Sequence, residues 1–421
     1  MSGESFTATT PVQRITALLD HESLVHGQVQ AHGSLVSGTG MIGGREVTII
    51  ATDRSMAGGS FGVVESKSCA ELLEQSRSMG RPFIMCLDSA GVRLDGGLPA
   101  LGAFRQLYRH MLDARLSGLP SLALIGRDCF GGASMLAATC TKRVYCQESR
   151  LAMSGPAVIQ ALGGFAELDA TDFDAVTALM GGAARAKLLH SDQLCDDFPD
   201  AYRLAARAWV AECGQSALPY LQRWHTQLGT RLLAQGVAPA APGNTSGELP
   251  EVLREIIPHG VKVHRMDGVL IGRSDQSSTN AFFGFIDGAA VGALAIWTLA
   301  GECLALAGER GDVAVTVFLD APGQATTLRD ERLMISEYVA HLSLVLSSLR
   351  ERGHRVTLQI FGDAGGGIYV GLAASVGRVV ALPGASIRLL PPAAMTLVLR
   401  RNTESGSVDE CMSAGVIDTL I

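Results

Sequence analysis

The sequence is poor in aromatic residues, in charge and in cysteine motifs, and each shortage excludes a class of protein. Aromatic residues make up 5% of the 421 residues, against 49 glycines, so small side chains in close contact must build the core. The net charge is −7 and no basic run occurs, which excludes nucleic acid as a partner. The nine cysteines contain no C-x-x-C spacing. They indicate reduced, buried thiols of a cytoplasmic protein and exclude a disulfide framework or a zinc ribbon.

Long apolar runs and metal-binding motifs are also missing. No run is long enough to span a membrane, and the N-terminus has no apolar signal segment, so we expect no membrane partner and a cytoplasmic location. The ten histidines do not cluster and no H-E-x-x-H occurs, so we expect no metal. A G-x-x-x-x-G-K-[ST] phosphate loop is absent as well.

Two glycine motifs match known fingerprints but stand in the wrong context. Gly38-x-Gly40-x-x-Gly43 lies between two apolar, strand-like runs, where a hairpin turn is expected and no helix opens as a dinucleotide site requires. The segment 58–62, GGSFG, fits the nucleophile elbow of hydrolases, but several small residues separate it from the preceding strand and no Asp–His pair stands out. We interpret it as a structural glycine loop and keep a hydrolase as the minority alternative.

The chain consists of two similar halves. The segment 235–251 is rich in Pro, Gly, Ala and Thr, as linkers are, and divides a first domain at 1–234 from a second at 252–421. Each half shows helix, strand, glycine-bearing loop, helix, strand, glycine turn with its helix, and strand. These elements are expected at 64–79, 82–88, 89–97, 101–117, 121–126, the turn 130–134 with its helix, and 143–146, and again at 288–307, 313–320, 321–327, 329–353, 356–362, the turn 363–369 with its helix, and 378–382. Such a repeat predicts two α/β domains that pack on one another, with a site between them at the carboxyl ends of the parallel strands.

The two glycine turns are the strongest candidates for chemistry. Each follows a strand and opens a helix, at 131–132 and at 365–367, and neither has the lysine that a stable phosphate site would need. Peptide N–H groups at a helix N-terminus suit a negative charge that forms briefly, as in an oxyanion hole. Glycines that only allow close packing are the alternative, which the matched pair of turns makes less favoured.

Longer stretches carry a family resemblance. GGSFGVVESKSCAELLEQSRSMGRPFIMCLDSAGVRL and RDCFGGASMLAATCTKRVYCQESRLAMSGPAVI resemble the carboxyltransferase branch of the crotonase-like superfamily, and within it the β subunit of biotin-independent malonate decarboxylase. FLDAPGQATTLRDERLMISEYVAHL, GDAGGGIY and ALPGASIRLLPPAAM are similar to the γ subunit of that enzyme. The resemblance covers about residues 11–200 and 261–421 and suggests a fusion of the two subunits.

The resemblance implies a fold, a reaction and a set of residues. The fold is α/β, with two crotonase-like ββα-spiral domains packed as an intramolecular pseudo-dimer. The reaction is decarboxylation of a malonyl thioester through an enolate, which needs no tightly bound cofactor. The first turn would hold the thioester carbonyl and the second the leaving carboxylate or CO₂. The implied catalytic residues are Gly131, Gly132, Gly366 and Gly367, and the implied substrate-binding residues are Ala90, Gly91, Arg93, Phe130, Gly155, Gly59 and Ser60.

The implied partners are an acyl carrier protein or CoA, which presents the acyl group on a phosphopantetheine thioester, an acyltransferase subunit, and further copies of the fused chain. Two alternatives stay open. A biotin-dependent acyl-CoA carboxyltransferase would use the same hole for the same enolate, and a non-catalytic scaffold would keep the fold and bind a carrier protein. Asp95-Gly96 and Gly365, which replace the Gln-Glu pair and the serine usual in the family, motivate the scaffold and suggest a biosynthetic acyl group or carrier.

Overall fold

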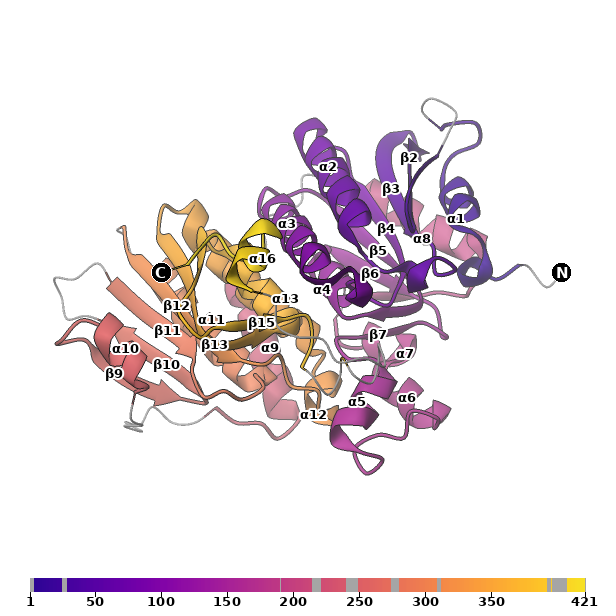
Figure 1. Ribbon diagram of the computed structural model, residues 1–421. Helices are drawn as coiled ribbons and strands as arrows, with labels where there is room; N and C mark the ends of the chain where they lie inside the picture. The colour runs from indigo at the N-terminus through magenta and orange to yellow at the C-terminus, as the bar shows by residue number, and fades with distance from the viewer. Residues whose placement is uncertain are drawn as a thin grey trace. The chain divides into compact units, whose positions relative to one another are not determined.

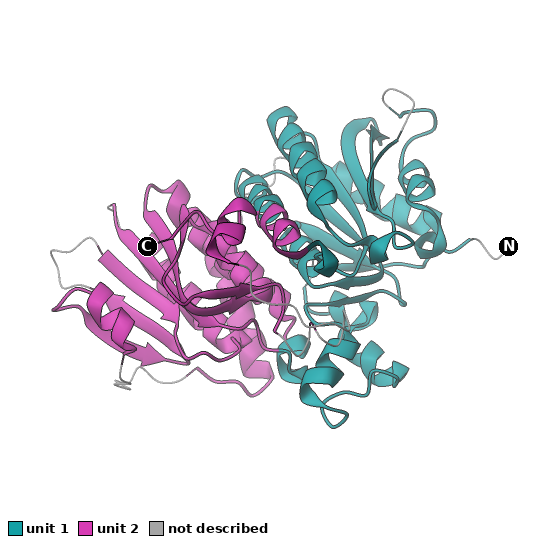
Figure 2. Cartoon of the chain, in the orientation of Figure 1, with its two compact units in different colours: residues 1–96, 106–219, 326–332 teal, residues 97–105, 220–325, 333–421 magenta. Residues whose placement is uncertain are grey.

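The computed structural model describes residues 4–24, 29–189, 191–213, 221–239, 249–273, 280–308, 312–391, 395 and 407–420. Contacts divide these residues into two compact units (Figure 2). Unit 1 comprises 1–96, 106–219 and 326–332, and unit 2 comprises 97–105, 220–325 and 333–421. The predicted domain boundaries differ from these units at 97–105, at 220–234 and at 326–332. Most of the predicted linker, residues 240–248, lies outside the described residues.

Unit 1 is built on a sheet whose strands run in the order β1-β2-β3-β4-β5-β6-β8, with β7 paired to the end of β5 (Figure 1). β1, β2 and β3 pair antiparallel, and from β3 onward the pairs are parallel. The strands are β1 (Gln30–His32), β2 (Leu35–Ile42), β3 (Arg45–Thr52), β4 (Phe83–Ser89), β5 (Ser121–Phe130), β6 (Lys142–Tyr145), β7 (Arg150–Ala152) and β8 (Gln193–Leu194). The hairpin of β2 and β3 contains the G-x-G-x-x-G segment, so the prediction of a turn there is confirmed.

Helices cover both faces of this sheet, because alternate strand residues on each face are apolar. Ile49, Ile84 and Leu122 face a core cluster with side chains of α1 and α8, whereas Thr48 bonds to Ser76 of α2 on the other face. The helices are α1 (Pro11–Leu18), α2 (Val63–Met79), α3 (Gly97–Leu116), α4 (Gly132–Thr139), α5 (Pro156–Gly163), α6 (Phe173–Met180), α7 (Gly182–Ala186), α8 (Pro199–Glu212) and α12 (Leu328–Arg332). Residues 97–105 of α3 are assigned to unit 2.

Unit 2 repeats the same topology. Its sheet has the order β16-β14-β13-β12-β11-β10-β9, and β15 pairs with the end of β13 as β7 does with β5. The strands are β9 (Lys262–Met266), β10 (Val269–Arg273), β11 (Asn280–Phe285), β12 (Ala314–Ala321), β13 (Arg355–Gly365), β14 (Arg378–Ala381), β15 (Ser386–Arg388) and β16 (Thr419–Leu420). The helices are α9 (Leu221–Ala234), α10 (Glu251–Ile256), α11 (Ala293–Ala307), α13 (Ile335–Glu351), α14 (Gly366–Ser375) and α16 (Val408–Ser413).

One predicted helix is wrong in detail. The segment 329–353 was expected to form a single helix, but it contains the end of α12 and all of α13. Met334, at φ +61°, turns the backbone into the left-handed region between them, which no continuous helix can contain. The chain therefore changes units within this segment.

All nine cysteines are free thiols, and seven of them are buried. Within the described ranges, no helix combines the length and the apolar content needed to cross a membrane.

Candidate active site

The first glycine turn joins β5 to α4. Gly131 adopts φ +54°, a backbone conformation that favours glycine, and Gly132 is the first residue of the helix. The N–H of Gly131 donates to the carbonyl of Met153 at 3.1 Å. The N–H of Gly132 has no acceptor among the described residues, as the first N–H groups of a helix have no partner within it. The turn therefore leaves the Gly132 N–H available to an outside acceptor, whereas the predicted Gly131 donor is already bonded to Met153.

A second glycine loop packs directly against this turn. Gly91 follows β4 at φ +100°, and a Cβ placed on it would lie 3.2 Å from the nitrogen of Gly132 and 2.8 Å from the carbonyl oxygen of Phe130. Its own N–H donates to the hydroxyl of Ser89 at 3.1 Å. A hydroxyl is a partner that can rotate away, which would free the Gly91 N–H for an anion held at Gly132. Ala90, between Ser89 and Gly91, is exposed.

The loop 58–62 packs against the second glycine loop, since Ala90 donates to the carbonyl of Gly58 and Phe61 donates to the carbonyl of Gly91. A Cβ on Gly59 would lie 2.2 Å from the carbonyl oxygen of Asp88, so only glycine allows this approach. Ser60 is 5% exposed, and its hydroxyl donates to the carbonyl of Ala57 at 2.6 Å. The loop ends in the capping interaction of α2, where the N–H of Gly62 donates to Glu65. These contacts favour the structural glycine loop over a hydrolase nucleophile.

Arg93 is held by the same loop. Its guanidinium forms an ion pair with Glu65 at 2.6 Å and donates to the carbonyl of Ser60 and the hydroxyl of Ser34. The pKa of Glu65 is lowered, since hydrogen bonds from the Ser34 N–H and Arg93 outweigh the effect of burial. Arg93 thus anchors the loops of the first half, and a direct contact with substrate stays a prediction.

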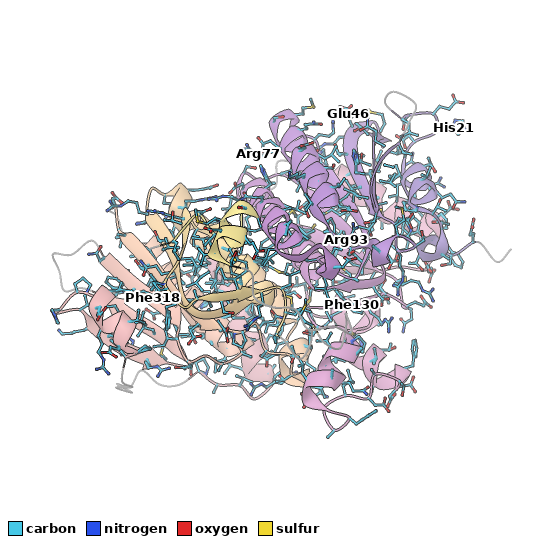
Figure 3. All side chains as sticks on the ribbon, viewed as in Figure 1. His21, Glu46, Arg77, Arg93, Phe130 and Phe318 are labelled. Carbon is cyan, nitrogen blue, oxygen red and sulfur yellow. The ribbon has the colours of Figure 1, made fainter. Side chains whose placement is uncertain are left out.

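Phe130 and Gly155 lie against each other at the end of β5 (Figure 3 labels Phe130). A Cβ on Gly155 would lie 3.4 Å from the Phe130 ring, and the ring packs on a small apolar cluster of β7, α5 and α6. The guanidinium of Arg150 lies 5.8 Å from the ring centroid. Phe130 is half-buried, so one part of the ring belongs to this cluster. All the predicted residues of the first half therefore gather at the carboxyl ends of neighbouring strands of unit 1.

Sequence reasoning missed the acidic residue that shapes this edge. Asp88 is 1% exposed and lies at a bulge between β4 and β5, where its carboxylate accepts the N–H of Asp128 at 3.2 Å and a hydrogen bond from Arg54 at 3.0 Å. Asp320 occupies the same place in unit 2 and accepts the N–H of Asp363 at 2.9 Å. The repeated segments LDSAG and LDAPG were the available signal.

Glu331 is a second residue that the motifs did not reveal. It belongs to unit 1, is fully buried, and accepts the N–H groups of Ser154 at 2.6 Å and Met153 at 3.3 Å. Because the carbonyl of Met153 holds Gly131, the Glu331 carboxylate supports the turn through one peptide unit. Burial raises its pKa to about 7, against the opposing effect of the Arg185 guanidinium 3.7 Å away.

The second glycine turn repeats the first but has both donors occupied. Gly366, at φ +60°, corresponds to Gly131, and its N–H donates to the carbonyl of Leu389 at 3.1 Å. The N–H of Gly367 donates to the side-chain oxygen of Gln324 at 2.8 Å. Direct binding of a carboxylate to these two N–H groups, as predicted, would require both existing bonds to break.

Neither a thiol nor a cation site offers a rival chemistry at the first turn. Burial raises the pKa of the Cys129 thiol well above its usual range, which disfavours a thiolate nucleophile. Among the described residues, Cys146, Glu148 and Asp197 lie close enough to share a cation. However, Asp197 already accepts hydrogen bonds from Ser5 and Thr7, so this group has a structural explanation.

Comparisons with known proteins agree with this doubled architecture. Residues 8–194 match the carboxyl transferase domain family, and residues 287–410 match the malonate decarboxylase gamma subunit family. The chain joins a carboxyl transferase domain to a malonate decarboxylase gamma subunit domain. The predicted resemblance to fused β and γ subunits is thereby confirmed.

Solved structures and curated relatives cover different shares of the chain. A Pseudomonas malonate decarboxylase hetero-tetramer in complex with malonate is 26% identical, with a TM-score of 0.50, over 59% of this chain and 95% of that one. The predicted crotonase-like fold is confirmed for each half taken by itself. The methylmalonyl-CoA carboxyltransferase 12S subunit of Propionibacterium freudenreichii subsp. shermanii is 31% identical over 36% of this chain. The beta5 subunit of a Mycobacterium tuberculosis acetyl-/propionyl-coenzyme A carboxylase is 32% identical over 37%. The chain covers only 29% and 31% of these two relatives.

Proposed function

We propose that this chain decarboxylates a malonyl thioester, carried on CoA or on an acyl carrier protein, to the acetyl thioester. The observation that carries the proposal is the unpaired N–H of Gly132 at the start of α4, with the Gly91 loop packed against it. The two family matches support the assignment, since a segment that matches the malonate decarboxylase gamma subunit follows the carboxyl transferase match along the chain.

The reaction breaks the bond between the α-carbon and the carboxylate carbon. The bonding electrons move toward the thioester carbonyl, CO₂ leaves, and the carbonyl oxygen gains the charge of an enolate. A proton then adds to the α-carbon. The Gly132 N–H, strengthened by the helix dipole and joined by the Gly91 N–H when Ser89 rotates, would donate to that oxygen.

The remaining assignments belong to the same proposal. No tightly bound cofactor is needed for these steps, and the thioester carrier is a substrate. We propose a cytoplasmic enzyme that works with an acyltransferase subunit and assembles with copies of itself. The similar Pseudomonas malonate decarboxylase structure is a hetero-tetramer, which supports the assembly of this chain with other subunits.

Substitution of Gly132 tests the donor directly. Gly132→Pro removes the N–H at the first helical position, where proline is well tolerated, and should lower kcat by about 10²- to 10³-fold. Gly132→Ala keeps the N–H and is the matched control for added bulk. Turnover of the proline variant equal to that of the alanine variant would contradict the assignment.

The reaction itself is tested with malonyl-CoA and malonyl-carrier protein, following CO₂ and the acetyl thioester without biotin. The curated relatives favour one second candidate, a carboxyltransferase. Product that forms only with a biotinylated carrier would establish that candidate. Tight carrier binding without turnover would point to a scaffold.

A further inference from the structure

A helix from the second half of the chain lies beside the first glycine turn. Residues 326–332, which include α12, follow β12 along the chain but belong to unit 1 (Figure 2). Leu328, at the start of α12, donates its N–H to the carboxylate of Glu167 at 2.6 Å and packs on the apolar cluster of β7, α5 and α6. Glu331, three residues later, bonds to the segment that follows β7. The second half therefore supplies an acid to the edge where the site residues of the first half gather.

One peptide group joins the Glu331 carboxylate to the turn. The carbonyl of Met153 and the N–H of Ser154 belong to the same planar peptide group. That N–H donates to Glu331 at 2.6 Å, and that carbonyl accepts the N–H of Gly131 at 3.1 Å. These groups form a chain of hydrogen bonds in which each bond polarises the next. A negative charge on Glu331 therefore makes the Met153 oxygen a stronger acceptor for Gly131.

The bonds of Gly131 set the direction of the Gly132 N–H. That N–H and the carbonyl of Gly131 belong to one planar peptide group, so they turn together. The Gly131 carbonyl accepts the N–H of Ser134 at 3.0 Å and its hydroxyl at 2.7 Å, while the Gly131 N–H is held by Met153. Glycine has no side chain to restrain its backbone, so these bonds hold the peptide in place. A weaker bond to Met153 would let the Gly132 donor turn away from the position of the oxyanion.

We propose that Glu331, in its ionised form, is a positioning residue for the oxyanion donor, which it holds through the Met153–Ser154 peptide and Gly131. The inference rests on the proposed function. A carboxylic acid is a weaker acceptor than a carboxylate, so the turn is held most firmly when Glu331 carries its charge. A residue of the second half thereby controls a donor of the first half, within unit 1.

Arg185 of α7 is the charged group that faces the Glu331 carboxylate. Its guanidinium lies 3.7 Å from Oε2 and donates to the backbone carbonyls of Leu151 and Glu331, at 2.8 Å each. Burial nevertheless raises the pKa of Glu331 to about 7, so its charge changes in a pH range where turnover can be measured. The other charged side chains of α12 and of the segments packed on it are exposed or bonded to other groups: Glu167, Asp174, Arg329, Asp330 and Arg332.

The amide of Gly131 reports on this chain of hydrogen bonds without any turnover. In protein labelled with ¹³C at the phenylalanine carbonyls and ¹⁵N in glycine, NMR selects the Phe–Gly peptides, and Phe130→Leu identifies the Gly131 signal by its loss. We expect the Gly131 amide proton to move downfield as the pH rises through about 7, because its hydrogen bond strengthens. The same signal should not titrate in Glu331→Gln. A wild-type signal that does not titrate, or one that titrates equally in Glu331→Gln, would overturn the proposal.

The pH dependence of turnover tests the consequence for the reaction. The carboxylate of malonyl-CoA stays ionised above about pH 5, so the substrate itself does not titrate in this range. We expect kcat of the wild type to rise about tenfold from pH 6 to pH 8.5, with KM changed by less than about twofold, since the donor acts mainly in the transition state. Glu331→Gln should keep a low kcat at every pH, and Glu331→Asp, which retains a carboxylate, should restore part of the rise.

Glu167→Gln is the matched control, because the Glu167 carboxylate also accepts a backbone N–H of α12, that of Leu328. It should keep the wild-type dependence of kcat on pH and the titration of the Gly131 amide. A rise of kcat with pH in Glu331→Gln that equals that of the wild type would contradict the role of Glu331.

The two readouts separate this proposal from the proposed function. A Gly131 amide that titrates only when Glu331 is present, in a chain that releases no CO₂, would support control of the turn by Glu331 and contradict decarboxylation. Release of CO₂ at a rate independent of pH, with a Gly131 amide that does not titrate, would contradict the role of Glu331 and support decarboxylation.

Discussion

Glu331 is a titratable residue that supports the first glycine turn, because its carboxylate binds the peptide unit whose carbonyl accepts the Gly131 N–H. Its pKa is raised to about 7 by burial, above its ordinary value of 4.5. The folded state then binds a proton more tightly than the unfolded chain, so this group's contribution to stability is complete below pH 4.5 and is lost as the pH rises through about 7.

Glu331→Gln should remove that part of the pH dependence. We expect the free energy of unfolding of the wild type, relative to this variant, to fall between pH 4.5 and 7 by up to about 1.4 kcal/mol per pH unit. Urea denaturation at a series of pH values measures it. Parallel curves for the two proteins would show that Glu331 keeps an ordinary pKa.

The glycine positions were predictable at this scale, and their hydrogen-bond partners were not. A strand followed by two glycines indicates a turn with positive φ, and Gly131 and Gly366 both adopt it. Which N–H stays unpaired depends on Met153 and Gln324, which fold back onto the turns from distant points of the sequence. An alignment of the loop after β4 with the loop after β12 would have shown Val92 at the position of Gln324.

Elements with a regular pattern were predicted well, and their ends were not. The helix expected at 64–79 is α2 (Val63–Met79), because its apolar spacing and the glycine after it define its extent. The strands β5 and β13 continue beyond the apolar runs to Phe130 and Gly365, since pairing with β7 and β15 extends them. No local sequence pattern predicts the pairing of these strand ends with β7 and β15.

Helix α3 contacts the C-terminal segment so closely that one methyl group should displace it. A Cβ on Gly102 would lie 1.7 Å from the carbonyl oxygen of Ala414, and Arg105 donates to the carbonyls of Gly415 and Val416. Gly102→Ala gains helix propensity of about 1 kcal/mol, but the backbone of this segment must move to admit the methyl. We expect a net loss of about 1–3 kcal/mol in thermal or urea unfolding.

Gln106→Ala, an exposed position one turn further along α3, is the control and should change stability by less than about 0.5 kcal/mol. Equal stability of Gly102→Ala and the control would mean that the C-terminal segment does not pack on α3.

On the scale of the whole chain, doubling of one α/β unit was visible in the sequence, and the exchange of segments between units was not. The order of strands is the same in both sheets, as the repeated motifs predicted. Residues 97–105 and 326–332 are assigned to the unit opposite to their half of the chain. Such exchanges depend on contacts between distant segments, and no periodicity records them.

The two units contain buried titratable groups of opposite kinds, an acid in unit 1 and two histidines in unit 2. Their stabilities should therefore change over different ranges of pH. In unit 2, His225 and His341 bond to each other at 3.2 Å, and the His225 ring stacks on Trp297 at 4.5 Å. Burial lowers the pKa of His225 to about 4 and that of His341 to about 3. The folded unit binds protons on these two rings less tightly than the unfolded chain does. The stability that this pair contributes is therefore present above about pH 6.5 and is lost as the pH falls toward 4.

His341→Gln tests this pair, because glutamine can still bond to the His225 ring but does not titrate. Its loss of unfolding free energy between pH 6.5 and 4.5 should be shallower than that of the wild type by up to about 1.4 kcal/mol per pH unit. His21→Gln is the matched control, since the His21 side chain is 92% exposed. Thermal unfolding of the three proteins across this range measures the slopes. An acid slope that is the same in His341→Gln as in the wild type would mean that the buried pair takes up its protons without opening unit 2.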